Sequence, residues 1–159
     1  MRDPRLSAKP PVCRLGCLVL LRNRRGHVLL IDPDFMDGLI LPGGSARPDE
    51  PPHEAAARHL RAETGLHRRV THLVAVDFTP ADRYLERLNL VFDGGTVADR
   101  EATRIAVPPR NRSGLLGARF VDPCELPGVM SPAQAARVQE ALATVPYRFP
   151  LLVHGQRAA

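Results

Sequence analysis

The segment 41–66, LPGGSARPDEPPHEAAARHLRAETGL, holds the residues of this sequence whose types and spacing could do chemistry. Glycine-rich loops let the main chain approach phosphates, and nearby carboxylates can bind a hard cation or take up a proton. The segment therefore predicts a site for a phosphate-containing substrate. Its candidate residues are Gly43, Gly44, Glu50, Arg58, His59 and Glu63.

A helix over 52–64 is expected to position these side chains. The alanines at 55–57 are strong helix formers, and Gly65 stands where a left-handed C-terminal cap belongs. At about 100° per residue, positions 59, 62 and 63 share one arc of the helix and face the same loop. Of these positions only Glu63 is acidic, and Ala62 cannot bind a metal.

The spacing of the segment resembles the Nudix box. Gly44 is followed after five residues by Glu50 and after seven more by Arg58. The box continues with Leu60, Glu63, Gly65 and Leu66. LPGG before it and ARFVDPCEL (118–126) also resemble Nudix sequences, so that the resemblance covers about residues 13–145.

The resemblance implies a Nudix-like α/β/α sandwich with a central mixed β-sheet. It also implies hydrolysis of a diphosphate bond in a nucleoside-diphosphate-linked substrate, with Mg²⁺ or Mn²⁺ as cofactor. Glu63 and the Gly43 carbonyl match the metal ligands, and Gly44 matches the substrate loop. Glu50 matches the residue that orients Arg58, and we count Glu50, Arg58, His59 and Glu63 as catalytic candidates.

Two positions depart from the Nudix pattern, because His59 and Ala62 stand where the family has glutamates. His59 could be a general base, a nitrogen ligand for manganese or zinc, or a helix histidine whose hydrogen bonds are satisfied. The departures predict slow turnover or a different metal geometry. The alternative is a catalytically impaired Nudix-like domain that binds nucleotides or serves regulation.

Residues outside the box could complete the site. Tyr84 is a candidate for stacking on a flat group of the substrate, whereas Phe78 and Phe92 are expected in the core. The acids that could finish a metal shell are Glu86, Asp93, Asp99 and Glu101, and the sequence does not rank them.

The composition fits one domain over 13–159, with a flexible segment 1–12 and a tail 146–159, in a chain of 159 residues. The net charge of +5 comes mostly from scattered arginines, and aromatic residues are few. This disfavours nucleic acid as a partner. The positive charge is best interpreted as a solvated basic surface, and binding of an anionic small molecule is the next interpretation. Whether the chain forms a homodimer is left open by the sequence.

The sequence has no apolar stretch of membrane length and no signal-peptide pattern, so we expect a cytoplasmic protein. In such a protein Cys13, Cys17 and Cys124 are expected to be apolar fillers.

Hydrophobic alternation predicts strands at 14–21, 27–31, 39–41, 70–78, 87–93 and 118–121. A turn is expected at 23–26, and Pro42, Gly43 and Gly44 close the third strand. A second helix begins after Ser131, which acts as N-cap with Gln134 in a capping box. Gly94 and Gly95 are expected to interrupt regular structure after the fifth strand. The tail shows no regular pattern.

Overall fold

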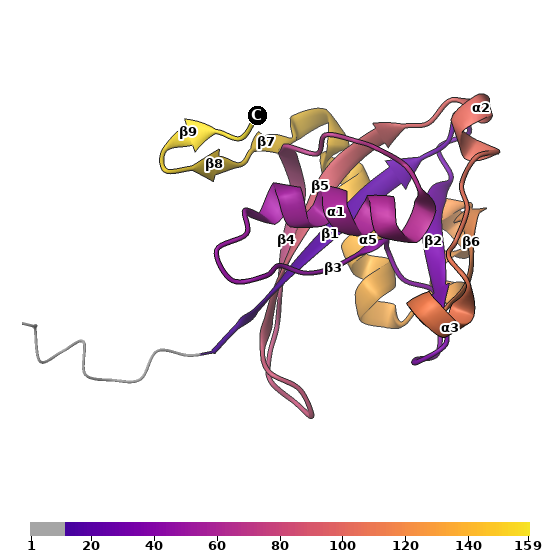
Figure 1. The fold of residues 1–159 in the computed structure, drawn as a ribbon, viewed down its shortest axis with the longest axis horizontal. Helices are drawn as coiled ribbons and strands as arrows, with labels where there is room; N and C mark the ends of the chain where they lie inside the picture. Colours follow the sequence, from indigo (N-terminus) through magenta and orange to yellow (C-terminus); the bar gives the residue numbers. More distant parts are fainter. Residues whose placement is uncertain (1–11) are drawn as a thin grey trace, which may run out of the picture.

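A mixed β-sheet forms the centre of the computed structural model, which describes residues 12–159 (Figure 1). The strand order is β6-β2-β1-β5-β4-β7, and β3 pairs with β1 beside this path. β1 and β5 are parallel, whereas the other neighbours are antiparallel. The strands are β1 (Arg14–Arg22), β2 (Val28–Pro33), β3 (Gly43–Ser45), β4 (His72–Thr79), β5 (Arg87–Thr96), β6 (Leu115–Val121) and β7 (Phe149–Pro150).

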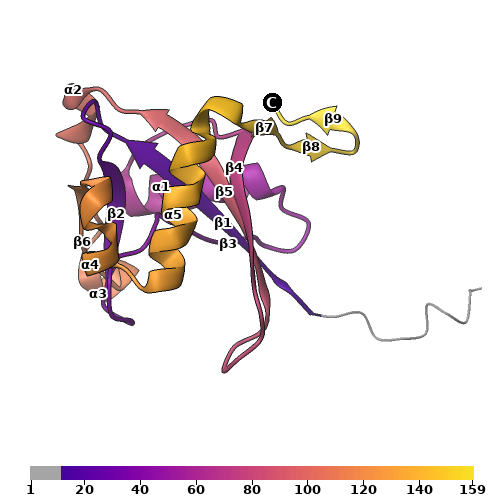
Figure 2. The same ribbon diagram turned by 180° about the vertical axis from the view of Figure 1, so that it is seen from behind.

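The two long helices, α1 (Pro52–Thr64) and α5 (Pro132–Thr144), cover opposite faces of this sheet (Figures 1 and 2). The expected α/β sandwich with a mixed central sheet is confirmed. The shorter elements are α2 (Asp99–Ala102), α3 (Arg110–Ser113), α4 (Leu126–Val129), the 3₁₀ turns Pro123–Glu125 and Val145–Tyr147, and a hairpin of β8 (Leu152–Val153) and β9 (Gln156–Arg157). No helix in the described part of the chain is long and apolar enough to cross a membrane.

Strand β1 shows how the sequence builds two cores. Cys17, Val19 and Leu21 point to the face under α1, whereas Leu20 points to the face under α5. The helices contribute small and branched residues, Ala55, Ala56 and Leu60 from α1 and Ala135, Val138 and Ala141 from α5. Because side chains of a strand alternate between faces, one apolar strand joins both layers.

The ends of both long helices follow the sequence prediction. Gly65 caps α1 in the left-handed conformation, with a φ of 77°, and its N–H binds the carbonyl oxygen of Arg61. Pro51 gives the start of α1 no side-chain cap. In α5, the Ser131 hydroxyl accepts a hydrogen bond from the N–H of Gln134 at 3.4 Å. The described residues show no return bond from the Gln134 side chain, so only one half of the predicted capping box is formed.

The third strand differs from the prediction. Of the segment 39–41 only Ile40 forms a bridge, with Ile31, and the strand consists of Gly43–Ser45 instead. Gly43 has a φ of 143°, and a Cβ there would overlap the main chain of Cys17 and Leu18 on β1. The absence of side chains therefore lets β3 lie close against β1.

Glycines 94 and 95 also lie within a strand, although the sequence suggested an interruption there. β5 continues to Thr96, and its pairing with β1 shifts between Leu20 and Leu21. Such a shift marks a β-bulge, which glycine tolerates well. The short helix α3 (Arg110–Ser113), which ends at Gly114 in the left-handed conformation, was not among the predicted elements.

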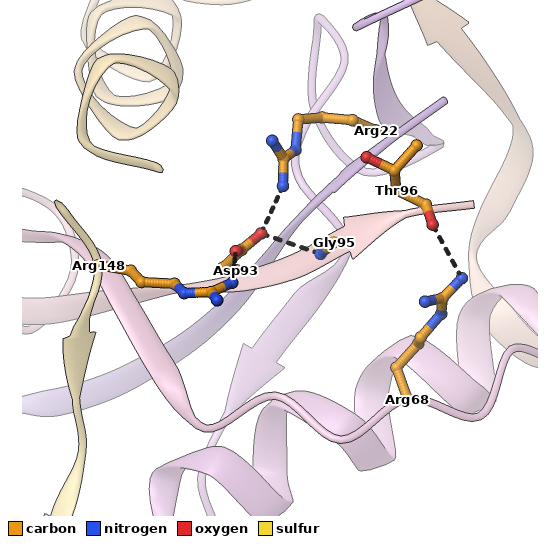
Figure 3. Close-up of polar contacts among 6 residues, drawn as sticks. All are labelled: Arg22, Arg68, Asp93, Gly95, Thr96 and Arg148. Carbon is orange, nitrogen blue, oxygen red and sulfur yellow. Dashed lines mark hydrogen bonds and ion pairs between the residues drawn. The ribbon is translucent and has the colours of Figure 1, made fainter. Parts of the chain in front are cut away.

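The tail is more regular than predicted, because β7 adds to the edge of the sheet beside β4. Asp93, whose side chain is 3% exposed, fixes this arrangement (Figure 3). It accepts hydrogen bonds from Arg22 at 2.7 Å, from Arg148 of the tail at 3.1 Å and from the N–H of Gly95 at 2.9 Å. The flexible segment predicted for 1–12 lies outside the described residues, apart from Val12.

The core predictions were partly wrong. Phe92 is fully buried as expected, but Phe78 is 55% exposed on β4. All three cysteines are free. Cys17 is an apolar core residue, and burial raises the pKa of its thiol to about 11. Cys13 and Cys124 are exposed and therefore do not fill the core.

Asp93→Ala is expected to destabilise the fold by about 3 kcal/mol, because it leaves Arg22 largely buried without its partner. Arg148→Ala is expected to cost about 1 kcal/mol or less, since Arg148 is 56% exposed. Urea unfolding at pH 7 measures both free energies. Equal losses for the two variants would contradict this ranking.

Candidate active site

The glycine strand β3 lies against the face of α1 that carries the predicted chemistry. The N–H of Gly43 donates to Oε2 of Glu63 at 2.9 Å, and Nε2 of His59 lies 3.0 Å from the carbonyl oxygen of Ser45. A Cβ on Gly44 would overlap the His59 ring. The structure therefore brings together the glycines, His59 and Glu63, as the spacing in the sequence predicted.

Glu50 and Arg58 form the expected ion pair at the start of the site. Arg58 donates through Nε and Nη2 to the two carboxylate oxygens at 2.6 and 2.7 Å, and the N–H of Arg47 adds a bond of 2.8 Å. These hydrogen bonds, that of Arg58 first, lower the pKa of Glu50 to about 2. The pair fixes the loop before α1 to the helix.

The electrostatic environment of Glu63 is the opposite of that of Glu50. Its carboxyl is half-buried, and within residues 12–159 no arginine, lysine or histidine forms an ion pair with it. Burial raises the pKa of Glu63 to about 7, against the smaller lowering effect of the Gly43 hydrogen bond. Near neutral pH this carboxyl can therefore both hold and release a proton.

The contacts of His59 bear on its three interpretations. A carbonyl oxygen only accepts, so the bond to Ser45 requires a proton on Nε2 and leaves this nitrogen without a free lone pair. The ring is half-buried against Gly44. This geometry suits a histidine that supports the glycine strand, while the lone pair of Nδ1 leaves the roles of general base and metal ligand as predictions.

A cavity of about 290 Å³ opens on the other side of β3, under the first turns of α5. The glycine strand lines it, and so do apolar side chains such as Leu18, Ile40 and Val138. β3 is thus shared: one side contacts α1 and the other borders the cavity. We call this cavity the β3–α5 pocket.

Arginines give the β3–α5 pocket its charge, and the sequence reasoning missed them. Arg14 and Arg87, opposite each other in the parallel register, line it without an ion-pair partner among the described residues. Arg137 also lines it and binds Asp77 at 2.6 Å. Arg87 and Asn89 alternate with leucines on the central strand β5, and this polar pattern was the available signal.

Other candidates lie apart from the pocket. Tyr84 is 73% exposed in the β4–β5 hairpin, where Arg87 lies over its ring at 5.7 Å, and it does not line the β3–α5 pocket. Among the downstream acids, Asp93, Asp99 and Glu101 are bound to arginines. A substrate contact of Tyr84 stays a prediction.

The donor set does not fit a magnesium shell. Mg²⁺ prefers six oxygens in near-octahedral geometry, with carboxylates among them. Here Glu63 is the only acid on its face of α1, Ala62 is exposed, and the described residues include no group of three His, Cys, Asp or Glu side chains that could hold a metal ion. The carbonyl of Gly43 stays a predicted ligand.

Comparison with known proteins identifies the family. A model of the NUDIX domain matches residues 14–144, and the chain therefore belongs to the NUDIX family. A search of curated proteins finds no match.

Solved structures share the fold. The MutT protein of Methanosarcina mazei Go1 has 21% identity and a TM-score of 0.70, over 86% of this chain and 96% of its own. A MutT NUDIX hydrolase of Burkholderia pseudomallei has 21% identity and a TM-score of 0.66, over 86% and 99%. An ADP-ribose pyrophosphatase of Streptococcus suis 89-1591 has 16% identity and a TM-score of 0.60, over 83% and 91%. At these identities the likeness shows the fold alone.

Glu63→Gln is expected to stabilise the protein at pH 8 by up to about 3 kcal/mol, in buffer with EDTA. The folded pKa of about 7 lies above the ordinary value of 4.5, so the folded state binds more protons between these values. Stability is therefore lost as the pH rises from 4.5 to 7, and glutamine removes this loss. The advantage should vanish near pH 4.5.

Urea unfolding at both pH values measures the effect. Glu54→Gln, an exposed position on the same helix, is the matched control and should change stability by less than about 0.5 kcal/mol. A Glu63→Gln variant that is no more stable than the native protein at pH 8 would contradict a half-buried carboxyl without a cationic partner.

Proposed function

We propose that this chain is a Nudix hydrolase of low turnover that cleaves the diphosphate bond of a nucleoside-diphosphate-linked small molecule. The observation that carries the proposal is the shared strand β3. It borders the arginine-lined β3–α5 pocket on one side and holds Glu63 on the other. A diphosphate that extends from the pocket past the edge of this short strand would have one phosphate held by the arginines and the other near Glu63.

The positive charge of the β3–α5 pocket supports binding of an anionic substrate there. Arg14 and Arg87 are free of ion pairs among the described residues, and guanidinium groups bind phosphate oxygens through paired hydrogen bonds. Their positive charge offsets the charge that develops on phosphate oxygens during attack. We assign them to substrate binding.

Glu63 is the residue best suited to take the proton. Water attacks one phosphorus, its proton passes to the Glu63 carboxylate, and the bond to the bridging oxygen breaks so that the second phosphate leaves. A base with a pKa of about 7 suits this transfer at neutral pH. Arg58 and Glu50 keep the loop and helix in place.

Low turnover follows from the acids that are missing. Nudix hydrolases generally use a divalent metal, and this chain has His59 and Ala62 where the family has glutamates. Metal positioning and charge stabilisation supply most of the rate in such reactions. Dependence on Mg²⁺ or Mn²⁺ stays a prediction that assays with and without EDTA test.

A second function is a Nudix-like domain that binds nucleotides without hydrolysis and serves regulation. The observation in its favour is the lack of a metal-binding group among residues 12–159. This function needs the arginines of the β3–α5 pocket but not Glu63. Turnover therefore separates the two functions.

Glu63→Gln is expected to lower turnover by about 100-fold, because it removes the general base. Product chromatography after incubation with nucleoside diphosphates and diphosphate-linked sugars measures the rate with Mg²⁺, Mn²⁺ or EDTA. Glu54→Gln should keep the native rate. Equal rates for native protein and Glu63→Gln reject hydrolysis at this site, and ligand-induced thermal shifts without turnover favour the binding domain.

Restoring the acids is expected to raise turnover. The double variant His59→Glu, Ala62→Glu reinstates the family pattern on α1, and we expect a rate with Mg²⁺ at least about tenfold above the native rate. The gain should disappear in EDTA. A folded double variant with no gain would contradict the claim that the two missing acids limit the reaction.

A further inference from the structure

Asn89 is a buried polar side chain in the β3–α5 pocket, with 6% of its surface exposed. It lies on the central strand β5, opposite Gly16 of β1 in the parallel register. A Cβ on Gly16 would overlap the Oδ1 of Asn89. The glycine therefore provides the space that the amide group occupies.

Hydrogen bonds to β4 fix the orientation of the amide. Its Nδ2 donates to Oγ1 of Thr79 at 3.2 Å and approaches the carbonyl oxygen of Asp77 at 3.4 Å. A carbonyl oxygen can only accept, so the nitrogen and oxygen of Asn89 cannot be exchanged. The nitrogen is committed to the neighbouring strand, whereas the oxygen lies beside Gly16, keeps some accessible surface and is free to accept a hydrogen bond.

Within residues 12–159, no donor binds the Oδ1 of Asn89. Apolar side chains such as Leu18 and Val138 line the same pocket as Asn89. An acceptor in a mostly buried site favours a ligand that brings an N–H donor, since an unpaired polar group costs free energy there. The pocket thus joins apolar walls, arginines and one oriented acceptor.

We infer that Asn89 binds an amino group on the base of the ligand, so that the chain prefers diphosphates of adenine, cytosine or guanine to those of uracil. Uracil has no amino group, and its imino N–H lies between carbonyl oxygens that would face the same acceptor. This role rests on the proposed function, because it places the base of the substrate in the β3–α5 pocket.

Equilibrium binding of ADP, CDP, GDP and UDP in EDTA tests the role of Asn89. We expect at least one amino-bearing diphosphate to bind native protein about tenfold more tightly than UDP. Asn89→Leu keeps a similar volume without the acceptor and should remove this preference, with UDP affinity changed less than about threefold.

Two controls separate recognition from a structural role. Thr79→Val removes a partner of Nδ2 but not the acceptor, and it should keep the base preference. The preferred diphosphate with its amino group dimethylated should bind native protein about tenfold less tightly, which tests the contact without any variant.

The outcomes distinguish this role from the proposed function. If none of the four diphosphates binds, the proposed function fails. Binding without a base preference, a preference that survives Asn89→Leu, or full affinity for the dimethylated ligand overturns the role of Asn89 alone.

Discussion

The hydrogen bond from the N–H of Gly43 to Glu63 is the contact on which the site depends. It joins the glycine strand β3 to helix α1, and β3 in turn borders the pocket on its other side. Glycine is required because a side chain at Gly43 would overlap β1. The close approach of the β3 main chain to β1 therefore determines both the shape of the pocket and the environment of the Glu63 carboxyl.

Some charged side chains of the site have ion-pair partners, and others have none among the described residues. Glu50 has a bidentate partner in Arg58, whereas Glu63 is half-buried with a backbone N–H as its hydrogen-bond donor. On the pocket side, Arg14 and Arg87 lack carboxylate partners among the described residues. A diphosphate would supply the missing negative charge beside a carboxyl that can accept a proton. Under the proposed function, this arrangement would let a Nudix frame short of acids bind and slowly cleave a diphosphate.

The sequence predicted the parts of this structure that depend on local rules. The ends of α1 follow from Pro52 and Gly65, and the facing of His59 and Glu63 follows from helical rotation. The glycine strand was misplaced because pairing with β1 outweighs the low strand propensity of glycine. Arg14, Asn89 and Arg87 come together through the parallel register of β1 and β5, a long-range pairing that local patterns do not specify.

A titration of the Glu63 side-chain carboxyl by carbon NMR, in EDTA, tests the central claim most directly. We expect a midpoint near pH 7, because the carboxyl is half-buried without a cationic partner in the described structure. A midpoint at the ordinary value of 4.5 would show a solvated or ion-paired carboxyl and would contradict the account.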